Sequence, residues 1–278
     1  MDNIFIHQIF YDELSRKSLD PQFIPLDNTN GPSDWFEFYP IMDYLKKTKL
    51  KENSWYGFLS PKFSQKTGIP ASEVINIISR FSDQANVAIF SPAWDQLAYF
   101  RNPFEQGEFA HPGLLEISQK FINETSLNID LAKLVTHSST AVFSNFIIAK
   151  PQYWIQWLQI ACQFYKYSTG SELGETSYLD ARNKMGPMKT FIQERLSSLV
   201  LSQGNFNTLA LDFGQSAPIF DQLFDNDPRT RKMLQTCDLL KERFATTQDL
   251  SYLNMYIKIR KEINFKQPHP KENYFLNI

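Results

Sequence analysis

Short apolar segments recur along the chain, and each is bounded by polar residues or by a proline. Segments that are apolar throughout and this short are typical of strands buried within a sheet. The predicted strands are residues 3–10 (NIFIHQIF), 55–59 (WYGFL), 87–90 (VAIF), 141–149 (AVFSNFIIA) and 207–213 (NTLALDF). Three of them are followed at once by Ser-Pro or Lys-Pro, at positions 60–61, 91–92 and 150–151, so each of these strands leads into a loop.

Between these segments, apolar residues recur every three or four positions, which predicts amphipathic helices. The predicted helices cover residues 35–46, 74–81, 114–122, 151–165, 188–200 and 227–263. Pro40 interrupts the first pattern, so we expect that helix to begin near Tyr39. Trp154 and Trp157 lie on one face of a later helix, where core packing is favoured over a platform for stacking sugars.

Strands that alternate with helices indicate an α/β protein in which helices cover the faces of a sheet. We expect an α/β domain over residues 1–213 and a helical C-terminal extension, packed on it, over residues 214–278. Ligands of open α/β sheets bind beyond the carboxyl ends of the strands. The three proline-containing loops after the strands are therefore where the sequence predicts chemistry.

Composition and charge narrow the class of protein. The chain has 278 residues, of which 42% are hydrophobic and 15% aromatic, enough for a large core. A net charge of −2 argues against a nucleic-acid binder. Two cysteines, Cys162 and Cys237, exclude a disulfide scaffold and favour a reducing compartment. With neither a signal-peptide pattern nor an apolar run of 18 residues, a cytoplasmic protein is predicted.

Most standard catalytic signatures are missing from the sequence. It contains no P-loop lysine motif, no glycine-rich dinucleotide turn, no paired CxxC and no nucleophile elbow. Its four histidines, which are His7, His111, His137 and His269, are too scattered to indicate a histidine-rich metal site. No cofactor is predicted, although a divalent cation, Mg²⁺ or Mn²⁺, stays open.

Several segments resemble glycosyltransferases of the GT-A class. Residues 35–47 (WFEFYPIMDYLKK) and 55–63 (WYGFLSPKF) are similar to the apolar helix and short strand of that class. Residues 143–160 (FSNFIIAKPQYWIQWLQI) are similar to its Asn-bearing strand that runs into an aromatic helix, and 104–113 (FEQGEFAHPG) to its loop over the donor site. The resemblance covers residues 2–165. It implies a GT-A-like, Rossmann-like mixed sheet flanked by helices, as in proteins of bacterial surface-polysaccharide biosynthesis.

The chain departs from that class where an Asp-x-Asp motif would hold a metal ion, since it has Ser60, Pro61 and Lys62 there. A lysine ammonium can stabilise a leaving diphosphate in place of the ion. The hypothesis is therefore a metal-independent transfer in which Lys62 is catalytic and Lys66 assists. Ser60 and Thr67 would add hydrogen bonds to the substrate. The alternative is that both lysines are ordinary solvated charges between a strand and a helix.

Acid–base chemistry at the acceptor hydroxyl requires a carboxylate or an imidazole. Asp95 and Glu105 are the preferred candidates for the base, because nearby aromatic residues would raise a carboxylate pKa. Glu108 and His111 are assigned to substrate binding. The competing interpretations are that Asp95 caps a helix and that His111 is a turn residue at a helix N-terminus.

Three further residues are predicted to bind substrate. Asn145 interrupts an apolar strand, and a buried amide must either hold neighbouring backbone or face a ligand. The resemblance favours the ligand. Tyr11 and Asp12 directly follow the first strand, at the turn where nucleosides bind in many α/β proteins.

Two functions compete on these grounds. The first is an enzyme that moves a sugar from a nucleotide-activated donor to a saccharide acceptor in polysaccharide assembly. The alternative is a non-catalytic carbohydrate- or nucleotide-binding protein that keeps the fold but has lost the metal motif. Peripheral membrane association through the basic residues 258–266 and the oligomeric state stay open. So do the sugar, the nucleotide, the acceptor and the stereochemistry of transfer.

Overall fold

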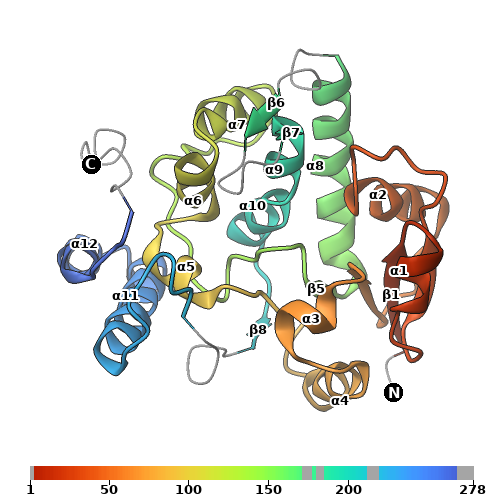
Figure 1. The fold of residues 1–278 in the computed structure, drawn as a ribbon, viewed down its shortest axis with the longest axis horizontal. Helices are drawn as coiled ribbons and strands as arrows, with labels where there is room; N and C mark the ends of the chain where they lie inside the picture. The colour runs from red at the N-terminus through yellow and green to blue at the C-terminus, as the bar shows by residue number, and fades with distance from the viewer. Residues whose placement is uncertain (1–2, 171–176, 180–184, 212–218, 268–278) are drawn as a thin grey trace. The chain divides into compact units, whose positions relative to one another are not determined.

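A computed structural model describes residues 3–170, 177–179, 185–211 and 219–267 (Figure 1). The chain forms two compact units. The sheet unit contains Met1–Pro92, Val142–Ser177 and Gly186–Leu211, and the helical unit contains Ala93–Ala141, Tyr178–Met185 and Asp212–Ile278. These boundaries differ from the expected division at residue 213, because residues 93–141 group with the C-terminal helices rather than with the sheet.

The sheet unit is built on a six-stranded mixed sheet with the order β2-β1-β3-β5-β4-β8. Its strands are β1 (Ile4–Phe10), β2 (Ile24–Asp27), β3 (Trp55–Leu59), β4 (Val87–Ile89), β5 (Ile147–Ala149) and β8 (Thr208–Ala210). β5 runs antiparallel to both of its neighbours, whereas all the other pairings are parallel. The expected α/β protein with a helix-flanked sheet is confirmed.

The central strands pair in a tight register. Ile4 lies opposite Trp55 and Gln8 opposite Leu59, so β1 and β3 are aligned along their full paired length. Gly57 is needed in β3 because a Cβ there would lie 2.8 Å from Ile148 Cγ1 on β5. This close approach explains a glycine inside a buried strand.

The strand predictions hold for the central buried strands and fail where the backbone turns or where a strand is exposed. Residues 141–149 were expected to form one strand, but only Ile147–Ala149 does. Ser144 and Asn145 have φ angles of 60° and 55°, and this left-handed backbone cannot continue a strand. β2 was not predicted, since its residues are mostly exposed and include Pro25. The last predicted strand is limited to Thr208–Ala210; residues 212 and 213 lie outside the described part.

Helices cover the sheet (Figure 1). The helix over Pro151–Thr169 contributes much of the core of this unit. They are α1 (Glu13–Lys17), α2 (Phe38–Lys47), α3 (Phe63–Thr67), α4 (Ala71–Phe81), α8 (Pro151–Thr169), α9 (Met188–Gln193) and α10 (Leu196–Gln203). Trp154 of α8 donates a hydrogen bond from its indole nitrogen to Tyr56 O and lies edge-on to Phe58. Trp157 is 1% exposed and packs against Phe38, which confirms core packing for both tryptophans.

The helical unit has a separate aromatic core. Its helices are α5 (Trp94–Tyr99), α6 (Pro103–Ala110), α7 (Leu114–Asn123), α11 (Pro228–Thr247) and α12 (Leu250–Glu262). The single helical stretch expected over residues 227–263 is divided at Gln248, which has a φ of 57°. Tyr99, Phe224 and Phe265 pack together, and the buried ammonium of Lys241 donates to two carbonyl oxygens of the α5 region.

A separate two-stranded sheet pairs β6 (Ser177–Leu179) with β7 (Met185–Pro187).

Candidate functional site

Strand direction decides which loops can share a site. β1, β2, β3 and β4 are mutually parallel, so their carboxyl ends lie at one edge of the sheet. β5 runs the other way, so the residues that precede it, Ser144 to Phe146, reach the same edge. We call this set of strand ends and residues 144–146 the carboxyl edge. Lys150 and Pro151 follow β5 and lie at the opposite edge, where Lys150 donates to Ser82 O. Of the three proline-containing loops, the two after β3 and β4 therefore lie at the carboxyl edge and the one after β5 lies at the opposite edge.

At the carboxyl edge, one contact joins the loop after β3 to the turn before β5. Lys66 Nζ donates to Ser144 Oγ at 2.9 Å and lies 5.6 Å from the centroid of the Phe146 ring. The neighbouring Asn145 is buried, and its Oδ1 accepts a hydrogen bond from Ser197 Oγ at 2.9 Å. Two consecutive left-handed residues are costly, and such strain is often concentrated at functional sites.

The remaining residues of the loop after β3 are used mainly within the loop. Ser60 Oγ accepts from Lys62 N, and Ser60 O accepts from the side chain of Gln8 on β1. Thr67 Oγ1 donates to Phe63 O, so the hydroxyl closes the short helix α3 rather than facing outward. Lys62 begins that helix and is exposed. Gly68 ends it with a φ of 73°, a conformation that favours glycine.

The two predicted residues after β1 differ in their surroundings. Asp12 caps α1 through a hydrogen bond from Ser15 N, and its hydrogen bonds with Ser15 lower the pKa of this carboxyl. Tyr11 is half-buried, and burial raises the pKa of its phenol, as does the nearby carboxylate of Glu37. Asp12 is thus a structural cap that also faces solvent, whereas Tyr11 contributes a neutral hydroxyl.

A neighbouring loop is held in place by α9. Lys189 is buried, forms an ion pair with Asp34 and lies 4.5 Å from the centroid of the Trp35 ring. Gln193 Nε2 donates to Trp35 O. Sequence reasoning missed this cluster because Lys189 is a buried cation within a helical pattern, where charge usually indicates exposure.

The predicted acid–base residues belong to the helical unit, and their oxygens are already engaged there. Asp95 is 1% exposed and accepts hydrogen bonds from Gln96 N at 2.9 Å and Phe220 N at 2.7 Å. Burial raises the pKa of its carboxyl. Asp95 is not the cap residue of α5, because Ala93 occupies that position. Its carboxylate instead holds a distant segment of the same unit.

The other three candidates of the helical unit are also part of its framework. Glu105 is 1% exposed, accepts from Arg101 N and pairs with Arg260, at 2.8 Å between Oε1 and Nη1. Both oxygens of Glu108 accept from Gly113 N, and one also accepts from Leu115 N, so Glu108 caps α7. His111 ends α6 in the turn that leads to α7. The eleven predicted site residues are thus divided between the two units.

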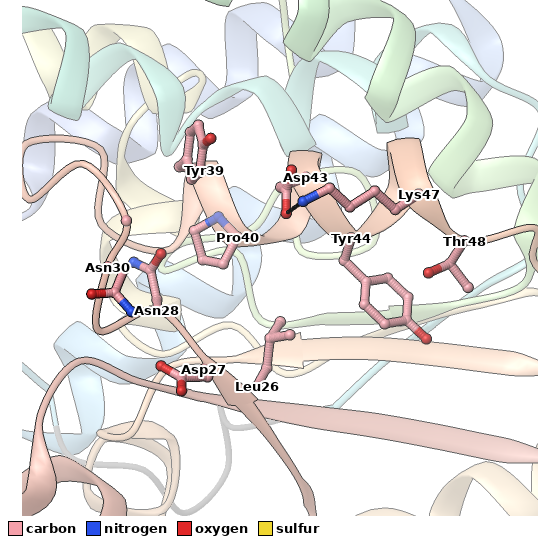
Figure 2. A pocket seen from close by; sticks show the side chains of 11 residues that line it. Leu26, Asp27, Asn28, Asn30, Tyr39, Pro40, Asp43, Tyr44, Lys47 and Thr48 are labelled. Carbon is pink, nitrogen blue, oxygen red and sulfur yellow. Dashed lines mark hydrogen bonds and ion pairs between the residues drawn. The ribbon is translucent and has the colours of Figure 1, made fainter.

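A cavity of about 420 Å³ opens between the end of β2 and helix α2 (Figure 2). It is lined by Leu26, Asp27, Asn28, Asn30, Gly31, Tyr39, Pro40, Asp43, Tyr44, Lys47 and Thr48. None of the predicted site residues is among them. Nothing in the sequence signals that residues 26–31 and helix α2 lie on either side of one cavity.

Two features of the described residues bear on possible ligands. No three histidine, cysteine, aspartate or glutamate side chains in the described ranges gather as ligands of a metal ion. In the same part of the chain, no helix has the length and hydrophobicity needed to cross a bilayer. Fold and site together define an α/β protein with a polar carboxyl edge. No protein-family model, curated protein or solved structure gives a significant match to the chain.

Proposed function

We propose that this protein is a GT-A-like glycosyltransferase that moves a sugar from a nucleotide-activated donor to a saccharide acceptor. The observation that carries the proposal is the gathering of polar side chains from three segments at the carboxyl edge. Tyr11 follows β1, Lys62 and Lys66 follow β3, and Asn145 precedes β5. Open α/β sheets bind ligands at this edge. The mixed sheet is also the kind of sheet that the resemblance to GT-A enzymes implies.

The proposed reaction is a displacement at the anomeric carbon of the donor. An acceptor hydroxyl oxygen bonds to that carbon while the bond from the carbon to the diphosphate oxygen breaks, and the leaving diphosphate takes the electron pair. The ammonium groups of Lys62 and Lys66 would offset the negative charge that develops there. The hydroxyl proton must pass to a base, the role that the sequence predicted for Asp95 or Glu105.

The setting of the reaction follows from the same proposal. Resemblance to surface-polysaccharide enzymes supports a role in polysaccharide assembly. Cys162 and Cys237 are both free thiols, which is consistent with a reducing compartment and supports a cytoplasmic protein.

A second candidate function is non-catalytic binding of a carbohydrate or nucleotide. The specific observation in its favour is that Asp95 and Glu105 each hold hydrogen-bond or ion-pair partners on both oxygens. An acceptor hydroxyl would have to compete with these partners for the same carboxylate oxygens.

Calorimetry with UDP, GDP and CDP tests the role of the lysines. Lys66→Ala and Lys62→Ala are compared with Lys258→Ala, which removes an exposed lysine from α12 in the helical unit. Removing one charge-assisted hydrogen bond should weaken binding about tenfold or more in the first two variants. The control variant should bind as the wild type does. Equal affinity in all four proteins would exclude both lysines from diphosphate binding.

Turnover separates the enzyme from the binding protein. The wild-type protein is incubated with a panel of nucleotide sugars, with and without Mn²⁺ and saccharide acceptors, and free nucleoside diphosphate is measured. Release of diphosphate that depends on Lys66 supports transfer. Binding of nucleotide sugars without any release, under all these conditions, supports the non-catalytic alternative.

A further inference from the structure

The cavity between β2 and α2 has the chemical character of a small-molecule site. Its volume of about 420 Å³ falls within the range of about 300–1,000 Å³ that is typical of such sites. Figure 2 shows Asp27, Asn28 and Asn30 on one side of the space and α2 on the other, with Tyr44 directed toward Leu26 and the Tyr39 ring on the far side of the helix. Aromatic and apolar walls therefore face carboxylate and amide groups.

Charge restricts the class of ligand. The lining contains two carboxylates, Asp27 and Asp43, and one ammonium, Lys47. Lys47 Nζ is already paired with Asp43 at 2.8 Å, so Asp27 is left without a cationic partner in the lining. Hydrogen bonds from Thr29 and the positive charge of Arg16 lower the pKa of Asp27, so it is ionised at neutral pH. The lining itself carries a net charge of −1, from two carboxylates and one ammonium, which disfavours a diphosphate or another anion.

The polar groups suit a ligand that carries many hydroxyl groups. Asp27 is exposed, and its Oδ1 accepts from Thr29 N at 2.8 Å, so the carboxylate is held by its own turn and can still accept from a ligand. The Asn30 side chain is likewise without a bond among the described residues, and it can both donate and accept. Each hydroxyl of a sugar also donates and accepts. Tyr39 and Pro40 supply flat apolar surfaces for the carbon-bound hydrogens of a sugar ring.

The lining is held in shape before any ligand enters. Asn28 is buried, donates from Nδ2 to Phe36 O, and its main-chain NH donates to Phe10 O. Tyr44 packs against His7 and Phe58, with ring centroids 4.6 and 5.1 Å away. A site that is already ordered loses less conformational freedom on binding.

We propose that this cavity is a binding site for a neutral saccharide, separate from the lysines of the carboxyl edge. Its sugar contacts would be Asp27, Asn28 and Asn30 on one wall and Tyr39 on the other. The inference does not depend on catalysis, because the cavity would bind sugar whether or not the protein transfers one. In a transferase, such a site would hold an acceptor saccharide chain.

Ligand-observed NMR and calorimetry with neutral sugars test this site. The probes are glucose, galactose, N-acetylglucosamine and the disaccharides cellobiose, lactose and chitobiose. We expect at least one to bind with a dissociation constant on the order of 1 mM, as for a small ligand with few contacts. A disaccharide that binds more tightly than its monosaccharide would indicate a glycan chain rather than a free sugar.

Three variants locate the binding. Asn30→Ala should weaken it about fivefold through one lost hydrogen bond, and Tyr39→Ala about tenfold through the lost stacking surface. Gly31→Ala should also weaken it, because the added Cβ would lie 1.9 Å from Asn28 Oδ1 and displace that amide. Asn254→Ala on α12 is the matched control and should bind sugar as the wild type does. Thermal melting confirms that each variant is folded.

Other outcomes overturn the proposal. No binding of any of the six sugars, or equal binding in wild type and folded variants, would exclude a saccharide site here. A saccharide site would also be excluded if UDP, GDP, uridine or adenosine binds to the cavity, which a weakening of that binding by Asn30→Ala would show. Diphosphate binding that responds to Lys66→Ala but not to Asn30→Ala bears only on the proposed transfer. The two proposals can therefore fail separately.

Discussion

Charged side chains play different parts in the two units. In the helical unit, Asp95 and Glu105 are almost fully buried, and each binds two partners in its own unit. At the carboxyl edge of the sheet unit, Lys62 and Lys66 are exposed, and the described contacts of Lys66 are one hydrogen bond and one aromatic ring. These carboxylates of the helical unit are thus buried against partners, whereas the lysines of the carboxyl edge stay exposed.

This difference shows what a raised pKa can and cannot indicate. Aromatic neighbours correctly predicted the direction of the shift for Asp95, since burial raises its pKa. The pKa alone does not say whether the oxygens are available. The hydrogen bonds of Asp95 to Gln96 N and Phe220 N answer that question, and they favour a structural role.

The largest effect is expected from breaking the buried ion pair of the helical unit. Arg260→Met leaves Glu105 buried at 1% exposure without its cation, which should lower the free energy of unfolding by about 3–5 kcal/mol. Urea unfolding monitored by circular dichroism measures the change. Lys258→Met, on the exposed face of the same helix, should change it by less than about 0.5 kcal/mol. Equal effects of the two substitutions would contradict a structural role for the pair.

The sheet unit offers the opposite case, a buried titratable group without partners. His7 on β1 packs between Tyr44 and Phe58, and burial lowers its pKa to about 4. Its ring nitrogens have no hydrogen-bond partner among the described residues. The unfolded chain therefore binds a proton on His7 between about pH 6.5 and 4 that the folded protein does not.

Because of His7, the free energy of unfolding should decrease as the pH is lowered from about 6.5 to 4. Its contribution at neutral pH, about 3 kcal/mol, is lost as the pH drops from about 6.5 to 4. His7→Phe keeps an aromatic ring in the stack and removes the titration, so its unfolding free energy should fall less steeply with acid. Urea unfolding at several pH values compares the slopes. Identical slopes for wild type and variant would show that His7 does not titrate in this way.

A smaller loss is expected at Asp95. Asp95→Ala leaves Phe220 N without its acceptor and leaves Gln96 N only its longer bond to Ala93 O, which should cost about 2 kcal/mol of stability. If transfer activity is observed, the folded fraction of this variant should retain it. Loss of activity with unchanged stability would instead support Asp95 as the catalytic base, and would remove the contrast between the units.

The sequence predicted the buried part of the fold well. β1, β3 and β4 are continuous apolar segments because both faces of a central sheet are covered. It failed for β2, whose outer position in the sheet lets it be mostly exposed and contain Pro25. The apolar residues of 141–146 serve packing. Ser144 and Asn145, within the same segment, adopt a left-handed backbone that no hydrophobic pattern encodes.

The site was predictable only in part, for a related reason. Residues that directly follow a buried strand can be placed at a sheet edge from sequence, which is how Lys62 and Tyr11 became candidates. The direction of β5 could not be read from its sequence, so the edge at which Lys150 lies could not be predicted. The cavity between β2 and α2 depends on two segments meeting in space, and their meeting leaves no local pattern.

The smallest effect on stability, and the sharpest test of the carboxyl edge, is expected at Ser197. Its hydroxyl donates to Asn145 Oδ1 at 2.9 Å and fixes the orientation of that buried amide. Ser197→Ala should cost about 1 kcal/mol of stability. If Asn145 contacts the donor, the variant should also bind nucleotide sugars more weakly, measured by calorimetry. Ser202→Ala on the same helix removes a hydroxyl that donates to Leu199 O, and should leave binding unchanged. Equal loss of affinity in both variants would mean that the helix, rather than the Asn145 amide, carries the effect.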